Sequence, residues 1–465
     1  MNVSVVTIVV VVFYLAATFF VGWRGKRLAS SDDMFNVFGR RAGTIRAASG
    51  YLSLIGGGEL ITICQMGYDN GLEVYFFLGG IAAGFLFLAL FSERLRRIAS
   101  ERGVTTFSGL FGDLFGPSAS TALTGVFVLS LGSLLSIQFI VGAQLIDSIT
   151  GVPATVAALV MAAIIVAYLL AAGYVAVLST DILRAVFMSL VLIIVVGFLF
   201  VYSRHIPPSN SFAPLGNLDR STFFALGMFA VICAGDVWQT VFASKDRSTA
   251  SRSLVIGAVC FLVFGGLIAL IGVSTKAVVP EIAAGSSALI EAIRQVIPGA
   301  LSPLMGLLIV GSVMATADTE IWVLSTSLLS SKLPSEARYA SKSSPHAAFH
   351  AELARKTRLM LPVVTLVALV LAYLTQNAQA LYQGMLVLLT SIAPVVFITM
   401  FVVLRKAAVV LSLWGGLISF LVLFGFFRAE VPLEYTFLPA LISLLLLGVG
   451  MLVPTSRSDE DFASK

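Results

Sequence analysis

Five acidic residues lie within or at the edge of long apolar blocks of this sequence, where a carboxylate can do chemistry. A charge at the centre of a bilayer costs at least about 2.5 kcal/mol, so an acid there should face a cavity, a partner or water. Such acids can hold a metal cation, a substrate ammonium or a proton. They are Glu59, Asp181, Asp236, Asp318 and Glu320.

Two of these acids directly follow glycine-containing breaks in the helical pattern. Glu59 follows the run 55–58 (IGGG), and Asp236 follows the run 233–235 (CAG). Unwound backbone at membrane depth persists only where it is buried in protein or lines a wet cavity. Secondary transporters place substrate and ion sites at paired breaks of this kind. The alternative is that the glycines only allow close helix packing.

A later apolar block carries a stripe of hydroxyl groups. Ser312, Thr316 and Thr319 are spaced by four and three residues, which places them on one helix face. Hard cations such as sodium prefer oxygen ligands, and these hydroxyls together with carbonyls freed by the first break can supply them. The alternative is that the stripe only holds two helices together.

The composition requires these residues to be carried by membrane helices. Of 465 residues, 58% are hydrophobic and 11% are charged, with a mean hydropathy of +1.00. A soluble domain carries roughly a quarter charged residues. The formal charge of +5 resides in short loops, so it indicates membrane topology rather than nucleic-acid binding. The three cysteines lie in apolar blocks and show no metal-ligand spacing.

Blocks of about 20 apolar residues match the thickness of a bilayer. We predict thirteen spans, near residues 4–23, 44–68, 73–91, 119–147, 152–172, 178–202, 221–244, 253–275, 301–329, 359–375, 381–404, 407–427 and 436–453. The two broken spans are the second and the seventh, which fits two five-helix halves of inverted topology. The predicted organisation is one transmembrane domain over 1–453. It has an extra helix at 4–23, repeats at about 44–202 and 221–404, and extra helices at 407–453.

Basic residues segregate to one side of these spans. The other side receives only Arg204, Arg220, Lys276, Arg294 and Arg428. The basic-rich side should be cytoplasmic, which places the N-terminus outside and the C-terminus, with a short tail at 454–465, inside. We therefore expect a multi-pass protein of a bacterial-type inner (plasma) membrane, with the lipid bilayer as its surroundings and no nucleic-acid partner.

Four stretches in order resemble motifs of the sodium:solute symporter family, whose members include sodium-driven sugar, proline and choline transporters. The resemblance covers about residues 30–330. The stretches are 38–43 (FGRRAG), 67–71 (GYDNG), 172–181 (AGYVAVLSTD) and 314–319 (MATADT). The resemblance implies an all-α, LeuT-type 5+5 inverted repeat with about thirteen helices.

The resemblance also implies a sodium site. It would use backbone carbonyls near Leu52 and Ile55 together with Ser312, Ala315 and Thr316, and Asp181 matches a family aspartate near the cytoplasmic ion path. Here the sequence departs from the family, because Ala315 stands at the first hydroxyl position of the motif; Ser312 can compensate. A motif resembling the family's QR-x-x-x-x-K includes Gln239 and Lys245, but Thr240 replaces its arginine.

The predicted substrate site surrounds the two breaks. Its expected residues are Gly57, Gly58, Glu59, Gly235, Asp236, Trp238 and Gln239, with Asp318 as a further intramembrane acid. Glu59 departs from the family's neutral or aromatic residue. It can bind a substrate ammonium, carry a coupling proton or pair with a protein cation. No span offers an obvious central Lys or Arg, so we favour the first two readings. Trp238 can stack on a cation or serve in packing.

The sequence therefore predicts a sodium-coupled symporter that imports a small organic solute, such as an amino acid or a quaternary amine, by alternating access. A proton-coupled symporter using Glu59 and a transporter-like solute sensor are the alternatives, and sodium or a proton is the only cofactor-like partner expected. A channel fits two dissimilar breaks poorly. Nothing in the sequence suggests an enzyme, because no nucleophile–base pair, metal cluster or phosphate loop is visible.

Overall fold

The computed structural model describes residues 5–202, 215–282, 287–330, 345–375, 378–427 and 431–452, and these residues are almost entirely helical. The predicted tail 454–465 lies outside the described residues. The first half of the chain forms α1 (Val5–Arg24), α2 (Asp32–Val37), α3 (Thr44–Leu52), α4 (Gly57–Asn70), α5 (Tyr75–Glu101), α6 (Phe107–Phe115), α7 (Pro117–Thr150), α8 (Ala154–Ala172) and α9 (Tyr174–Tyr202).

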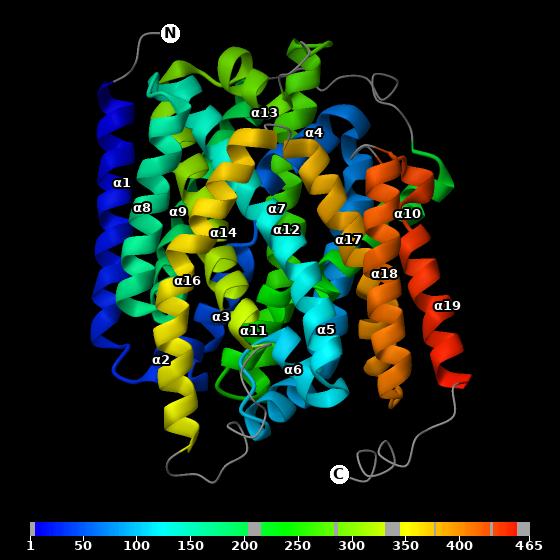
Figure 1. Ribbon diagram of the computed structural model, residues 1–465. Coiled ribbons are helices and arrows are strands. Elements are labelled where there is room, and N and C mark those ends of the chain that lie inside the picture. Colours follow the sequence, from blue (N-terminus) through cyan, green and yellow to red (C-terminus); the bar gives the residue numbers. More distant parts are fainter. Residues whose placement is uncertain are drawn as a thin grey trace.

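The second half repeats this pattern of long and broken helices. It forms α10 (Asn217–Ile232), α11 (Gly235–Ala243), α12 (Arg247–Val278), α13 (Ala288–Glu291), α14 (Ser302–Ser330), α16 (Pro345–Thr375), α17 (Ala378–Thr399), α18 (Lys406–Phe426) and α19 (Leu438–Leu452). Figure 1 shows the long helices running side by side, with α6 near the lower end of the view and α13 near the upper end. We call these two ends the α6 side and the α13 side.

Both predicted breaks are present. The span expected at 44–68 divides into α3 and α4, with residues 53–56 outside either helix. The span expected at 221–244 divides into α10 and α11, which are bent by 44° at the break. Glycine lowers helix stability, and three successive glycines at 56–58 remove the side chains that would pack along a continuous helix.

The number of spans depends on how joined helices are counted. Among the described residues, eleven helices are long and apolar enough to cross a membrane, or twelve if the bent pair α10–α11 is one span. Each of the thirteen predicted ranges overlaps one helix or one broken pair. The counts differ because the 3-10 turn Gly71–Val74 joins α4 to α5, which makes one continuous helical stretch where the sequence predicts two spans.

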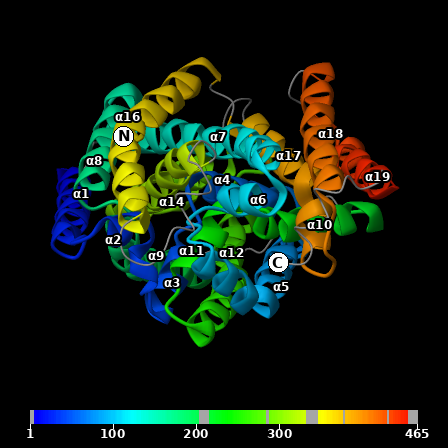
Figure 2. The same cartoon turned by 60° about the horizontal axis from the view of Figure 1, so that its bottom comes forward.

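Two groups of helices face each other across the middle of the molecule. The first, which we call the bundle, contains α3, α4, α5, α10, α11 and α12, and α5 packs extensively on both α10 and α12. The second, which we call the frame, contains α7, α8, α9, α14 and α16, with α14 packed along α7 and α9. Figure 2 shows α4, α11 and α14 near the centre, whereas α1 and α19 lie at opposite edges. Both helix breaks belong to the bundle and lie next to the frame.

The short helices α6 and α13 occupy matching places in the two halves. α6 follows α5 on the α6 side, and α13 follows α12 on the α13 side (Figure 1). Counterparts on opposite faces are what an inverted repeat produces, because the second copy crosses the membrane in the opposite sense. This agrees with the predicted two halves, whose boundaries stay a prediction.

The motif 38–43 closes the α6 side of the bundle. Arg40 donates hydrogen bonds to the carbonyls of Phe242, Ala99 and Val104 at 3.1, 3.2 and 2.7 Å. Ala42 pairs with the end of α11, donating to the Ala243 carbonyl at 3.0 Å. These contacts tie the entry to α3 to the exit from α11, so the two broken helices are held together on one side of their breaks.

Candidate functional site

The break between α3 and α4 turns its carbonyls toward hydroxyls of α14. Ser312 donates to the Ile55 carbonyl at 2.6 Å, and Thr316 donates to the Ser53 carbonyl at 2.8 Å. Both hydroxyl side chains are buried. The break therefore provides carbonyls that no helix uses, and the hydroxyl stripe provides the side-chain oxygens, as the predicted sodium site requires.

Two further predicted ligands lie at the same place but contribute less. The Leu52 carbonyl accepts a hydrogen bond from the Ile55 amide at 3.1 Å. Ala315 has no side-chain oxygen, and its own carbonyl accepts from Thr319 at 3.2 Å. Ser312, one turn away on the same helix, supplies a hydroxyl to the break. The assignment of these residues to sodium stays a prediction.

Asp181 is linked to the break through Ser53. The Ser53 hydroxyl donates to one oxygen of the Asp181 carboxylate at 2.8 Å, while the Ser53 carbonyl accepts from Thr316. Asp181 is 1% exposed. Ser53 therefore connects Asp181 to Thr316 of the predicted sodium site, and a role for Asp181 on an ion path stays a prediction.

Arg184 corrects one expectation from the sequence. We found no obvious central basic residue in any span, yet Arg184 of α9 is fully buried. Its guanidinium lies 2.7 Å from Asp318, donates to the Tyr168 hydroxyl at 2.9 Å, and approaches Asp181 at 3.5 Å. The Tyr168 hydroxyl also donates to Asp318 at 2.7 Å. Asp318 is thus neutralised inside the protein and is not available to a solute.

The N-terminal ends of the broken helices are already capped by acids and an amide of the chain. The Gly56 amide donates to Glu59 at 3.0 Å, and the Gly57 amide donates to Gln138 of α7 at 2.7 Å. On the other broken helix, the Val237 amide donates to its neighbour Asp236 at 2.8 Å. Free helix N-termini attract anions. Here those N–H groups have partners, so a substrate carboxylate would have to displace them.

An inner cavity of about 80 Å³ lies between the two breaks. Two acids, Glu59 and Asp236, line it together with the hydroxyl-bearing Thr316. Most of the remaining lining is apolar and includes the aromatic side chains Phe77, Phe85, Phe127, Phe261 and Tyr382. Among the described residues, no Lys, Arg or His lines it. The lining of the cavity therefore combines two acids and a few hydroxyl groups with a largely apolar surface.

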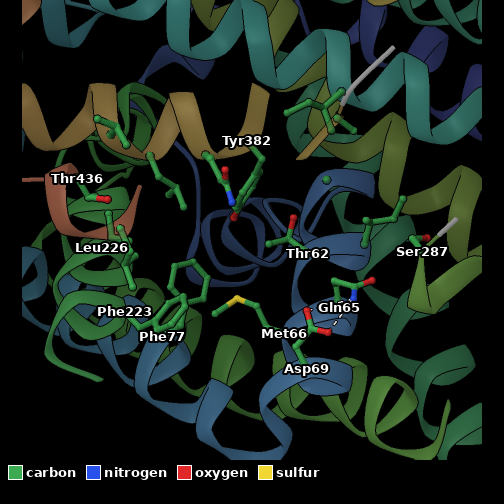
Figure 3. Close-up of a pocket in the computed structure, with 18 of the residues that line it drawn as sticks. Thr62, Gln65, Met66, Asp69, Phe77, Phe223, Leu226, Ser287, Tyr382 and Thr436 are labelled. Carbon is green, nitrogen blue, oxygen red and sulfur yellow. Dashed lines mark hydrogen bonds between the residues drawn. The ribbon is translucent and has the colours of Figure 1, made fainter. Parts of the chain in front are cut away.

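An outer cavity of about 270 Å³ lies above it toward the α13 side. Figure 3 shows Thr62 and Met66 of α4, Phe223 and Leu226 of α10 and Tyr382 of α17 around it. Asp69 lies at its exposed rim and accepts a hydrogen bond from Gln65 at 3.1 Å. Phe77, Tyr382 and Leu386 line both cavities and separate them. This is the arrangement of a site reached from the α13 side.

The predicted substrate residues divide into those near the cavities and those elsewhere. Gly58 lines the outer cavity, Gly235 lines the inner one, and Gly57 is pressed against Val313 and Gln138. The structure does not bring Trp238 or Gln239 to either cavity. Both side chains are buried, and Gln239 has no hydrogen-bond partner for either amide atom among the described residues.

Trp238 instead closes the site on the α6 side. Its ring stacks on Phe107 of α6 with centroids 4.0 Å apart and planes 6° from parallel, and its N–H donates to the Ile232 carbonyl at 2.8 Å. One face of the indole is thus covered by another aromatic ring. This favours the packing interpretation of Trp238 over cation stacking.

Sequence reasoning missed three residues of this site. Ser53, Gln138 and Tyr382 contact the break or the cavities. Ser53 lies between the predicted ligands Leu52 and Ile55, whereas Gln138 and Tyr382 stand in apolar blocks without a neighbouring signal. A polar amide such as Gln138 at mid-helix is costly in a membrane, so its presence alone was the available signal.

The fold defined by these helices is that of LeuT-type secondary transporters. It matches a Na⁺-coupled sialic acid symporter in a substrate-bound outward-open state, with a TM-score of 0.76, 15% identity and 96% of each chain covered. It also matches MHP1, a nucleobase-cation-symport-1 family transporter in a closed conformation, with a TM-score of 0.60, 15% identity, and 92% of this chain and 98% of that chain covered.

The family model of the Sodium:solute symporter family matches residues 35–204. This confirms the resemblance stated from the motifs. The family and the structural neighbours are transporters, not enzymes. No curated protein sequence matches the chain.

Proposed function

We propose that the chain imports a small organic cation together with sodium by alternating access. The observation that carries this proposal is the lining of the inner cavity, where Glu59 and Asp236 meet apolar and aromatic side chains. A substrate ammonium would neutralise these carboxylates, and its hydrocarbon part would contact Phe77 and Phe127. Of the solutes that the sequence suggested, quaternary and simple amines fit best.

The same lining argues against acids as substrates. A carboxylate solute would meet two acids, no basic side chain among the described residues, and helix N-termini that Glu59, Gln138 and Asp236 already cap. The ammonium of a zwitterionic amino acid would be attracted by Glu59 and Asp236, whereas its carboxylate would be repelled by the same two acids. A neutral sugar would find few hydroxyl or amide groups in the inner cavity.

Sodium is proposed to bind where Ser312 and Thr316 meet the carbonyls of Ser53 and Ile55. Both hydroxyls belong to the frame and both carbonyls belong to the bundle. An ion between them would hold the two groups of helices in one relative position. The two groups can rock against each other to open the site to either side, as in other repeat transporters. Solute transport is coupled to sodium if the bundle and the frame rock against each other only when the sodium site is occupied.

A cationic solute also changes the energetics of transport. Each positive charge that moves inward gains about 2.3 kcal/mol per 100 mV of membrane potential. One sodium ion and one monovalent amine together carry two charges. Uptake into proteoliposomes should therefore be accelerated by an inside-negative potential and should collapse when either the sodium gradient or the potential is removed.

The substrate class is tested with a thermal-shift screen of amines, amino acids, carboxylates and sugars, each with and without sodium. We expect stabilisation by amines, and a larger shift in sodium. Stabilisation by carboxylates instead would overturn the proposed class.

Glu59→Gln tests the ammonium contact directly. Because the amide cannot neutralise a cation, we expect affinity for the stabilising amine to fall at least tenfold, which corresponds to about 1.4 kcal/mol. Glu93→Gln, on the exposed end of α5, is the matched control. If Glu59→Gln leaves amine affinity unchanged and only flattens the pH dependence of uptake, Glu59 carries a proton instead.

The orientation is likewise a proposal. The segregation of basic residues supports an orientation with the α6 side in the cytoplasm and the α13 side, with the outer cavity, outside. A protease site added after residue 465 should be cleaved only from the cytoplasmic side in intact cells.

A further inference from the structure

Glu320 is a deeply buried acid that the proposed cycle does not use and that, unlike Asp318, forms no ion pair among the described residues. It lies on α14 four residues beyond Thr316, which places it on the same helix face one turn closer to the α6 side. Its side chain is fully buried, and neither carboxylate oxygen has a hydrogen-bond partner among the described residues. A buried carboxylate in this condition is costly unless a cation or a proton neutralises it.

The surroundings of Glu320 are acidic. The charges that act on it come from Glu59 of α4, Asp236 of α11 and Asp318 of α14 itself. Gln138 of α7 influences both Glu59 and Glu320, and its N–H₂ group has no hydrogen-bond partner among the described residues. Gln138 is fully buried. An unpartnered donor thus belongs to the same buried surroundings as these acids.

The basic groups on helices that pack against α14 are engaged elsewhere. Arg184 of α9 holds Asp318 and Asp181. On α16, the described basic side chains face other partners or solvent: His350 lies near Asp33, Arg355 is exposed, Lys356 pairs with Glu352, and Arg358 stacks on Phe35. The helices packed against α14 also carry the hydroxyls of Tyr168 on α8 and Tyr14 on α1, which lie beside Arg184. Tyr174 of α9 stacks on Trp322 of α14 and shares a hydrogen bond with Thr240, and Asp113 of α6 pairs with Arg102.

The acids belong to two groups of helices that must move apart. Glu320 and Gln138 are carried by the frame, whereas Glu59 and Asp236 are carried by the bundle. The hydrogen bond from the Gly57 amide to Gln138 crosses this boundary. Repulsion between like charges falls with distance, so rocking of the bundle changes how strongly the bundle acids disfavour a charge on Glu320.

We propose that Glu320 is a proton-binding site whose occupancy depends on which way the transporter faces, so that a proton takes part in the transport cycle. This rests on the proposed alternating-access function. In the present arrangement, with the site closed on the α6 side, the bundle acids are close and Glu320 holds a proton. When the bundle moves away, Glu320 ionises and the proton leaves toward the α6 side.

A metal ion fits the position less well than a proton. Among the described residues, no group of three or more His, Cys, Asp or Glu side chains could hold a metal ion. Glu320 also lines neither the inner nor the outer cavity. A proton needs no coordination sphere, and it satisfies a carboxylate by turning one oxygen into a donor.

The test measures the direction the protein faces as pH changes, without sodium or solute. Cys233 lies buried at the break between α10 and α11, and it becomes the single reporter after Cys64→Ala and Cys260→Ala. Its alkylation by a maleimide from the α6 side reports opening toward that side. We expect the alkylation rate, relative to the same protein with Glu320→Gln, to change at least fivefold between pH 6 and pH 8.5.

Two variants complete the design. Glu93→Gln, at a partly exposed acid that pairs with Arg96 on α5, should keep the full pH response. Glu320→Asp should keep a response because it retains a titratable group. If Glu320→Gln does not fold, Glu320→Met serves the same comparison. Alkylation of a thiol accelerates with pH in every variant because the thiolate is the reacting form, so each rate is compared with that of the neutral variant at the same pH. A ratio of the parent rate to the neutral-variant rate that stays constant between pH 6 and pH 8.5 overturns the proposal. A response to sodium rather than to pH that depends on Glu320 also overturns it and assigns a metal cation. Uptake assays test the proposed function separately, since this measurement uses no solute.

Discussion

At the scale of single residues, the interior is organised by charge. Five buried acids lie along the bundle–frame boundary, and Arg184 is the basic side chain buried among them in the described part of the chain. Arg184 satisfies Asp318 at 2.7 Å and reaches Asp181 at 3.5 Å. The acids near the inner cavity have no such partner. Asp318 and Asp181 are therefore held by an internal cation, whereas Glu59 and Asp236 line the inner cavity without one.

Replacing Arg184 should test the role of this internal cation. Arg184→Gln leaves Asp318 buried without a cation, and breaking a buried ion pair costs about 3–5 kcal/mol. We expect a large fall in the thermal midpoint of the detergent-solubilised protein, partly recovered by adding Asp318→Asn. Arg220→Gln, which breaks a partly exposed pair with Glu73, should cost less than about 1 kcal/mol. Equal losses in the two single variants would contradict this account.

Restoring the family hydroxyl at Ala315 should strengthen the sodium site. Ala315→Ser adds an oxygen on the helix that already presents Ser312 and Thr316 to the break. We expect sodium affinity, titrated by thermal stabilisation, to rise roughly threefold to tenfold, which corresponds to about 0.7–1.4 kcal/mol. Ala317→Ser, two residues on and on another face, is the control. An equal rise in sodium affinity for Ala317→Ser would show that the effect does not depend on where the hydroxyl is added along α14.

Residues of this site differ in how far the sequence predicts them. Ser312 and Thr316 were predicted because a spacing of four residues fixes a shared helix face. Arg184 was not, because hydropathy does not fix its depth within the block 178–202, and its partner Asp318 lies 134 residues away in sequence. Trp238 was expected at the substrate because it follows a break, but the turn of α11 directs it to Phe107.

At the scale of helices, close approach of backbones builds the bundle. α4 crosses α12 where Gly67 lies against the Ala269 carbonyl and Gly272 lies against the Cys64 carbonyl. Small residues permit such contact in membranes, where packing rather than the hydrophobic effect drives helix association. The broken helices were predictable, since glycine runs beside acids mark them. The number of spans was not, because the turn Gly71–Val74 joins two helices that hydropathy separates.

Gly272→Ala should loosen the contact between α4 and α12. Its Cβ would collide with the backbone of α4, which cannot move aside as a flexible side chain can. Overpacking of this kind costs typically about 1–3 kcal/mol. We expect a lower thermal midpoint and slower uptake. Gly197→Ala on α9 has open space and should be neutral, or stabilising by up to about 1 kcal/mol. A neutral Gly272→Ala would show that the crossing tolerates a wider separation.

At the scale of the whole molecule, the two sides are closed by different means. Toward the α13 side, Phe77, Tyr382 and Leu386 lie between the two cavities and line both of them. On the α6 side, α6 packs against the frame, and its Phe107 stacks on Trp238 of α11 in the bundle. Arg40 adds a hydrogen bond to the carbonyl of Phe242, close to this stack. The structure therefore represents a conformation closed on the α6 side.

Trp238→Ala should shift the molecule toward opening on the α6 side. Losing the stack removes an aromatic contact worth roughly 0.5–1.5 kcal/mol beyond the buried area. With Cys233 as the single cysteine, its alkylation from the α6 side should accelerate severalfold, while Trp238→Phe should stay close to the parent rate. Unchanged alkylation in Trp238→Ala would place the closure elsewhere, most directly at the Arg40 contacts.

The remote partner of Arg184 also matters during synthesis of the chain. Asp318 is made 134 residues after Arg184, a delay of roughly 7–27 seconds at about 5–20 residues per second. During that interval α9 must reside at the translocon or in lipid while the Arg184 guanidinium lacks its partner Asp318. Asp181, three residues earlier on the same helix, and Tyr168 on the preceding helix have both been made by then and can accompany it. Asp181, a residue of the predicted ion site, would thus also neutralise the Arg184 side chain while the chain is being synthesised.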